Sequence, residues 1–173
     1  IHYNMELGKD LVAALFQVSP YHLLKDFKND LYLKLARNFL RFRWLLTYLY
    51  GAAPLAEAGF YSQEYPQPIR SFRNSDYGYV NDENIQVSYT SLEQYVTDIE
   101  NYVQSGELSA EKEFYSAVRF RGQKHNRAYL EQGITYLEFR CFDLNPVDHL
   151  GISPETVDTV HLFLLGRLWL DDV

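Results

Sequence analysis

The chain has 173 residues, of which 47% are hydrophobic, with a formal net charge of −7 and a single cysteine, Cys141. This length and composition predict one domain with a hydrophobic core and exclude a chain that is disordered by composition. The acidic balance argues against a general nucleic-acid or membrane-surface binder, while one cysteine excludes a disulfide framework and a cysteine-rich zinc site and is typical of a reducing, cytoplasmic compartment.

The chain opens on a pattern that is typical of a strand. His2, Asn4 and Glu6 alternate with apolar residues over residues 1–7, so these three side chains would share one face. The first ten residues lack the basic start and apolar run of a secretory signal. A short helix is expected next, over residues 11–16.

A long helix is predicted over residues 20–50. Ser19 followed by proline has the form of a helix start, and apolar residues then recur every three or four positions. A break near Asn29 is the alternative. Since a helix rises about 1.5 Å per residue, the unbroken helix would be roughly 45 Å long. We expect such a helix to pack against more protein than this chain contains.

The second half of the chain mixes strands and helices. The predicted elements are a long loop over 61–84, a short strand over 85–89, a helix over 92–106 that begins at a capping box at Ser91, strands over 114–121 and 134–142, and a last helix over 154–170. The fold class predicted is therefore α+β, an antiparallel sheet with packed helices.

The strand predicted over 134–142 carries two charged residues among apolar ones. Glu138 and Arg140 are two residues apart, so they point to the same sheet face roughly 6.5–7 Å from each other, whereas Cys141 lies on the other face and suits a core. Burying such charges is costly unless they are paired or bind a ligand. The pair is therefore either a structural ion pair or a hard-metal ligand beside a phosphate clamp, because Mg²⁺ prefers carboxylate oxygen and Arg matches phosphate.

Three further places could bind ligands. His2 is either a hydrogen-bonded structural residue or a metal ligand. The loop over 69–79 holds Arg, Tyr and Gly, and it is either a site for a small-molecule carboxylate or a solvated loop. Tyr115, Arg119 and Arg121 alternate along one strand face and could meet a polyphosphate; RNA is the less favoured ligand because the chain is acidic. No phosphate-binding glycine loop, dinucleotide fingerprint or nucleophile elbow is found.

Four segments together resemble the bacterial glutamate–cysteine ligase family, also called γ-glutamylcysteine synthetase. They are Ile1-His2-Tyr3-Asn4, residues 41–54 (RFRWLLTYLYGAAP), residues 73–79 (RNSDYGY) and residues 136–146 (YLEFRCFDLNP). They occur in order across nearly all of the chain. Their sequences are most similar to the ligase half of the bifunctional glutathione-forming enzymes of Gram-positive bacteria.

The resemblance implies a fold and an activity. It implies part of a glutamine-synthetase-like catalytic domain, in which ATP and Mg²⁺ or Mn²⁺ drive ligation of the L-glutamate γ-carboxyl to the L-cysteine amine through γ-glutamyl phosphate, the first step of glutathione biosynthesis. The implied roles are as follows: metal ligands Glu138 and His2, acyl-phosphate stabiliser Arg140, cysteine-binding residues Arg73, Tyr79 and Tyr115, and residues near nucleotide phosphate Arg119 and Arg121.

One departure from the family pattern concerns the metal. The family's other metal-binding carboxylates lie in a glutamate-rich strand upstream of the histidine motif, and this chain does not contain that strand. Residues 1–173 are therefore expected to be the central and C-terminal part of one catalytic domain, inactive alone. The rest of that domain, with or without a fused ATP-grasp glutathione synthetase domain, would be its partner.

Two alternatives remain open. One is a related carboxylate–amine ligase with another amine acceptor, although an Arg at position 73 favours an acceptor that bears a carboxylate. The other is a non-catalytic binding or assembly module that keeps the fold without its metal strand.

Overall fold

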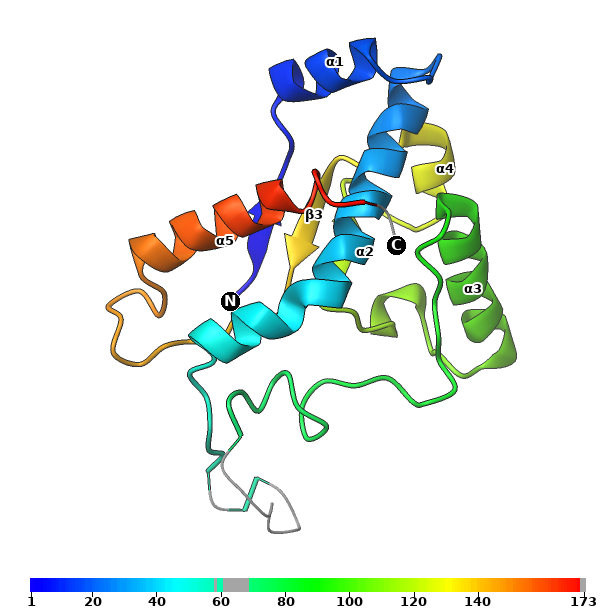
Figure 1. Ribbon diagram of the computed structural model, residues 1–173. Helices are drawn as coiled ribbons and strands as arrows, with labels where there is room; N and C mark the ends of the chain where they lie inside the picture. Colours follow the sequence, from blue (N-terminus) through cyan, green and yellow to red (C-terminus); the bar gives the residue numbers. More distant parts are fainter. Residues whose placement is uncertain (58, 61–68, 172–173) are drawn as a thin grey trace.

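A three-stranded antiparallel sheet positions the polar residues of this protein. The computed structural model describes residues 1–57, 59–60 and 69–171. Strands β1 (Tyr3–Met5), β3 (Tyr136–Phe139) and β2 (Val118–Arg121) lie in the order β1-β3-β2, so the central strand is the last in sequence. Helices pack around this sheet (Figure 1). The predicted α+β class is confirmed.

The core lies on one face of the sheet, against the long helix α2 (Leu24–Tyr50). Leu137 and Phe139 of β3 are fully buried there, and the ring of Phe139 meets that of Phe39 from α2 edge-on, with 4.6 Å between the centroids. Cys141 is 4% exposed beside them, and burial raises the pKa of its thiol to about 12. Cys141 is therefore a core residue, as predicted.

Helix α2 runs unbroken through the middle of the molecule (Figure 1) but begins at Leu24, four residues later than predicted. The reason is that the Ser19 hydroxyl donates to the Phe16 carbonyl, so Ser19 ends the preceding helix, α1 (Lys9–Gln17), instead of starting the next. The alternative break near Asn29 is wrong. The Asn29 carboxamide is satisfied outside the helix, where its oxygen accepts from the Ile134 amide.

The remaining helices follow local signals. Helix α3 (Leu92–Ser105) starts at Ser91, whose hydroxyl accepts from the backbone N–H of Gln94. It ends at Gly106, which has a left-handed conformation. Helix α5 is capped in the same way by Ser153 but stops before residue 170. The bounds of α5 are Pro154–Gly166. Two short elements were not predicted, the 3-10 helix η1 (Glu111–Glu113) and the helix α4 (Ala128–Gln132).

The short strand predicted over residues 85–89 is wrong. This segment is irregular because its backbone groups bond to side chains of α3 instead of to a neighbouring strand. The Tyr102 hydroxyl accepts from the backbone N–H of Gln86 and donates to the backbone carbonyl of Asn84, both at 3.0 Å. The Asp98 carboxylate accepts from the Ser88 amide at 2.8 Å.

Replacing Tyr102 with Phe should therefore loosen this segment alone. Each lost hydrogen bond is worth about 1 kcal/mol, so amide hydrogen exchange at Gln86 should accelerate about fivefold while the β3 amides are unchanged. Tyr48→Phe is the control, since that ring is 69% exposed. If the Gln86 amide exchanged at the same rate in both variants, Tyr102 would not be what holds this segment.

All three strands are shorter than predicted, and after β3 side chains from a loop take the place of a strand partner. The Arg140 carbonyl accepts from Arg73 Nε (2.6 Å), and the Cys141 carbonyl accepts from Asn74 Nδ2 (2.8 Å). The loop predicted over 61–84 is irregular over residues 69–84, and residues 61–68 lie outside the described part of the chain. Within the described ranges, no helix is both long and apolar enough to cross a membrane.

Candidate active site

The sheet face opposite the core is polar. Glu138 on the central strand is paired with Asn4 of β1 and Arg119 of β2, so all three side chains project to this face. The alternation also places Arg121, two residues along β2 from Arg119, on this face. The predicted strand alternation is therefore confirmed, and the sheet gathers the charges from three separated segments.

Glu138 is the centre of this face. It is only 6% exposed, and its carboxylate is within ion-pair distance of three basic side chains. Arg121 Nε donates to Oε2 at 2.6 Å, whereas His2 Nδ1 and Arg140 Nε lie 3.3 Å and 3.5 Å from Oε1. The two oxygens thus differ: Arg121 engages Oε2, and Oε1 faces His2 and Arg140.

The charges around Glu138 set its protonation. Burial raises the carboxyl pKa, but the hydrogen bond and charge of Arg121, with His2 and Arg140, outweigh it and leave the pKa of Glu138 below its ordinary value. The pKa of His2 is lowered, chiefly by burial. At neutral pH the site therefore presents an ionised carboxylate beside a neutral imidazole, which is the protonation state that metal ligation requires.

Several buried polar atoms at this place have no hydrogen-bond partner among the described residues. They are Oε1 of Glu138 and both Nε and Nη1 of Arg140. Because buried polar groups are nearly always satisfied, such a cluster is typical of a place where a ligand, an ion or a water molecule binds. A carboxylate oxygen with a neutral imidazole fits part of the coordination shell of a divalent cation. No third His, Cys, Asp or Glu of the described residues joins them to complete a metal cluster.

Arginine and tyrosine side chains extend the site beyond the sheet. The Arg140 guanidinium lies 5.1 Å from the Tyr115 ring centroid, that ring stacks on Tyr79 at 5.5 Å, and the Arg73 guanidinium lies 5.2 Å from the Tyr79 centroid. A cavity of about 400 Å³ is lined by Arg73, Tyr79 and Tyr115 together. The structure therefore brings the three residues of the implied cysteine site into one place next to Arg140.

The loop that carries Arg73 is fastened by Asp143. One oxygen of this carboxylate accepts from the Ser71 hydroxyl at 2.9 Å, and the other accepts from the Ala52 and Ala53 amides at 3.0 and 3.2 Å. Three segments far apart in sequence meet at one side chain. This role of Asp143 was not predicted, since no local pattern tells which backbone groups a carboxylate will meet.

Arg119 and Arg121 are placed differently from each other. Arg121 is bound to Glu138, as described above. The guanidinium of Arg119 instead donates through one nitrogen to the carbonyls of Lys112 (2.5 Å) and Phe114 (2.7 Å). The role near nucleotide phosphate therefore stays a prediction for both residues, and Arg119 would have to exchange protein carbonyls for phosphate.

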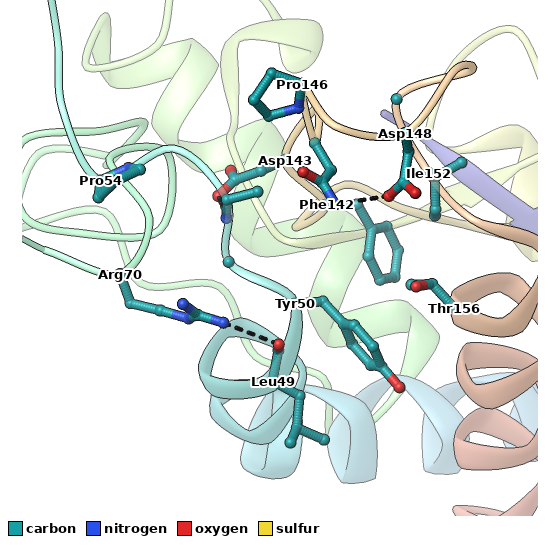
Figure 2. A pocket seen from close by; sticks show the side chains of 14 residues that line it. Leu49, Tyr50, Pro54, Arg70, Phe142, Asp143, Pro146, Asp148, Ile152 and Thr156 are labelled. Atoms are coloured by element: carbon teal, nitrogen blue, oxygen red, sulfur yellow. Dashed lines mark hydrogen bonds between the residues drawn. The ribbon is translucent and has the colours of Figure 1, made fainter.

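A second cavity, of about 410 Å³, lies at the end of α2 (Figure 2). Its charged groups are occupied: Arg70 donates to the carbonyls of Tyr48 and Leu49, and Asn145 donates to Asp148. Glu138 and Arg140 do not line it. The cluster around Glu138, with its unsatisfied atoms, is therefore the better candidate for chemistry.

Comparisons with known proteins agree with this site. The family model described as glutamate-cysteine ligase matches residues 1–172. The glutathione biosynthesis bifunctional protein GshAB of Streptococcus thermophilus is 68% identical over 171 residues, which are 99% of this chain and 23% of that protein. The corresponding protein of Pasteurella multocida is 49% identical over 176 residues, again covering 99% and 23%. This chain thus spans about a quarter of the length of these relatives.

Two solved structures have the same fold. A crystal structure of a bifunctional glutathione synthetase from Pasteurella multocida matches with a TM-score of 0.91 at 48% identity, over 99% of this chain and 23% of that one. A glutamate–cysteine ligase from Francisella tularensis, solved in complex with AMP, matches with a TM-score of 0.78 at 27% identity, over 99% and 41%. By sequence and by fold, this chain belongs to the glutamate–cysteine ligase family.

Proposed function

We propose that this chain supplies part of the active site of an enzyme that joins the γ-carboxyl of L-glutamate to the amine of L-cysteine at the expense of ATP. The observation that carries the proposal is the buried Glu138 carboxylate, which three basic side chains surround while its Oε1 and the Arg140 guanidinium keep unsatisfied atoms. This arrangement suits a charged substrate and a cation better than it suits a closed structural ion pair.

The first step would be transfer of the γ-phosphoryl group of ATP to the glutamate γ-carboxylate, which yields γ-glutamyl phosphate and ADP. The cysteine amine would then attack the acyl carbon, and phosphate would leave. Such chemistry depends on positioning and on neutralising the charge of the moving group. Arg140, a fixed cation with free donors facing Glu138, would stabilise the acyl phosphate.

Glu138 and His2 would hold Mg²⁺ or Mn²⁺, which would neutralise phosphate charge. The remaining ligands would come from substrate phosphates and from other parts of the protein. Arg121 would keep Glu138 ionised and oriented through its 2.6 Å hydrogen bond. Arg121 and Arg119 would also lie towards the nucleotide phosphates, although Arg119 would first have to leave the Lys112 and Phe114 carbonyls.

The cysteine substrate would bind at Arg73, Tyr79 and Tyr115. Arg73 uses its Nε to hold the Arg140 carbonyl, and its two Nη groups have no hydrogen-bond partner among the described residues. These groups form a fork that matches a carboxylate. The two stacked tyrosine rings would form one wall of the acceptor pocket, beside Arg140, where the acyl phosphate would lie.

Residues 1–173 would form the central and C-terminal part of one catalytic domain. The described part of the chain exposes large aromatic side chains that a partner would cover, among them Trp44 (62%), Tyr48 (69%) and Trp169 (69%). The rest of the ligase domain would cover these rings and would supply the missing metal ligands. Since the Streptococcus thermophilus and Pasteurella multocida relatives are named bifunctional, a glutathione synthetase domain would be fused to it.

The test compares two proteins, the full-length protein that carries this chain and the 173-residue chain alone. With glutamate, cysteine and Mg-ATP, the full-length protein should release ADP and form γ-glutamylcysteine, and it should prefer cysteine over putrescine in competition. The chain alone should release no ADP, because a His–Glu pair cannot complete an octahedral shell. If the chain alone released ADP, and Glu138→Gln abolished that release, the proposal that this chain holds only part of the active site would be wrong.

A further inference from the structure

Tyr115 lies before β2 and outside the sheet, yet one side chain satisfies both of its backbone polar groups. The Tyr115 amide donates to Asn81 Oδ1 at 2.8 Å, and Asn81 Nδ2 donates to the Tyr115 carbonyl at 2.7 Å. A carboxamide that accepts from N–H and donates to C=O offers the same pair of groups as the backbone of an adjacent strand. Asn81 thus replaces a strand partner where the sheet has ended.

This pair of hydrogen bonds also fixes the loop that carries Tyr79. Tyr79 lies two residues before Asn81 and is 63% exposed, so core packing does not hold it. Ser75, Gly78 and Asp82 make backbone hydrogen bonds within the loop. The tether at Asn81 crosses from the loop to the segment before β2, and next to it the Tyr79 and Tyr115 rings stack at 5.5 Å with 27° between their planes.

The backbone that carries Glu138 and Arg140 is held separately from this tether, although the Arg140 guanidinium contacts the Tyr115 ring. The Arg140 amide donates to the Ala117 carbonyl at 2.8 Å, and Glu138 lies within β3. The backbone of Glu138 and Arg140 is thus held by the sheet, whereas the backbone of Tyr115 and the loop that carries Tyr79 are joined through Asn81. Removing Asn81 would therefore affect the two sides of the site unequally.

We propose that Asn81 is a positioning residue for the amine acceptor: by bonding both backbone groups of Tyr115 it keeps the Tyr79–Tyr115 pair in the place where the acceptor binds. The inference rests on the proposed function, because the acceptor site is part of that proposal. It assigns Asn81 no contact with the reacting atoms.

The test measures steady-state kinetics of the full-length protein. Asn81→Ala removes both hydrogen bonds and should raise KM for cysteine about tenfold, while KM for glutamate and kcat change less than about twofold. Asn81→Asp keeps an acceptor for the Tyr115 amide but sets a carboxylate oxygen against the Tyr115 carbonyl, so its KM for cysteine should also rise about tenfold or more. Asn84→Ala is the matched control, since Asn84 is exposed in the same loop and its described hydrogen bonds use its backbone.

Two results would overturn the role of Asn81. One is a KM for cysteine in Asn81→Ala and Asn81→Asp that equals that of Asn84→Ala. The other is an equal rise in KM for cysteine and glutamate, which a purely structural role would produce. A wild-type protein without ligase activity would instead refute the proposed function itself, so the two failures are distinguishable. If Asn81→Ala does not fold, Asn81→Asp alone decides between these results.

Discussion

Replacing Glu138 with Gln in the full-length protein should lower kcat for ligation by on the order of 10³ or more. The substitution keeps the size of the side chain and the oxygen that accepts from Arg121 but removes the negative charge. Arg121, Arg140 and His2 all lie within 3.5 Å of that charge, and the proposed metal needs it as a ligand. ADP release at saturating substrates is the measurement.

The matched control is Glu131→Gln, which removes one charge from an exposed glutamate at the end of α4. Its kcat should stay within about twofold of wild type, as expected for a surface substitution away from a site. A loss in Glu138→Gln of less than about tenfold, with both variants folded, would mean that Glu138 is a structural ion pair and not part of the catalytic machinery.

The second large effect is expected from Phe39→Ala in the core. Phe39 is fully buried and packs edge-on against Phe139, which lies on the strand that carries Glu138. Truncating a buried phenylalanine costs about 3–5 kcal/mol, because apolar contacts are lost and a cavity remains. Amide exchange in β3 of the full-length protein should accelerate between about a hundredfold and several thousandfold.

Phe39→Leu is the control for this prediction. Leucine keeps most of the volume, so the loss should stay below about 1.5 kcal/mol and exchange in β3 should accelerate about tenfold or less. If the exchange rate of the β3 amides were unchanged in Phe39→Ala, the packing of α2 against the sheet would not be what stabilises the strand that carries Glu138.

The polar face of the sheet could be predicted from local alternation. Two-residue spacing placed Glu138 and Arg140 on one face and Cys141 on the other, and the structure confirms both. The approach of His2 to Glu138 could not be derived in that way, because it depends on the pairing of β1 with β3 across more than 130 residues. Only the family resemblance suggested that these two side chains act together.

Several errors in the predicted elements have one physical cause, which is that side chains compete for backbone groups. Ser19 caps the end of α1, so α2 begins later than its serine–proline signal indicates. Tyr102 and Asp98 bond the backbone near residue 86, so a strand-like pattern there finds no strand partner. Asn81 and Asp143 bind distant backbone groups as well, and a single sequence does not reveal such partners.

Oxygen transfer tests whether ligation at the Glu138 site passes through an acyl phosphate. The full-length protein would be given glutamate labelled with ¹⁸O in its γ-carboxylate, together with cysteine and ATP. Phosphoryl transfer requires that one labelled oxygen appear in inorganic phosphate for each γ-glutamylcysteine formed, and Glu138→Gln should form neither. Label found in AMP, or retained entirely in the dipeptide and water, would exclude γ-glutamyl phosphate as the intermediate.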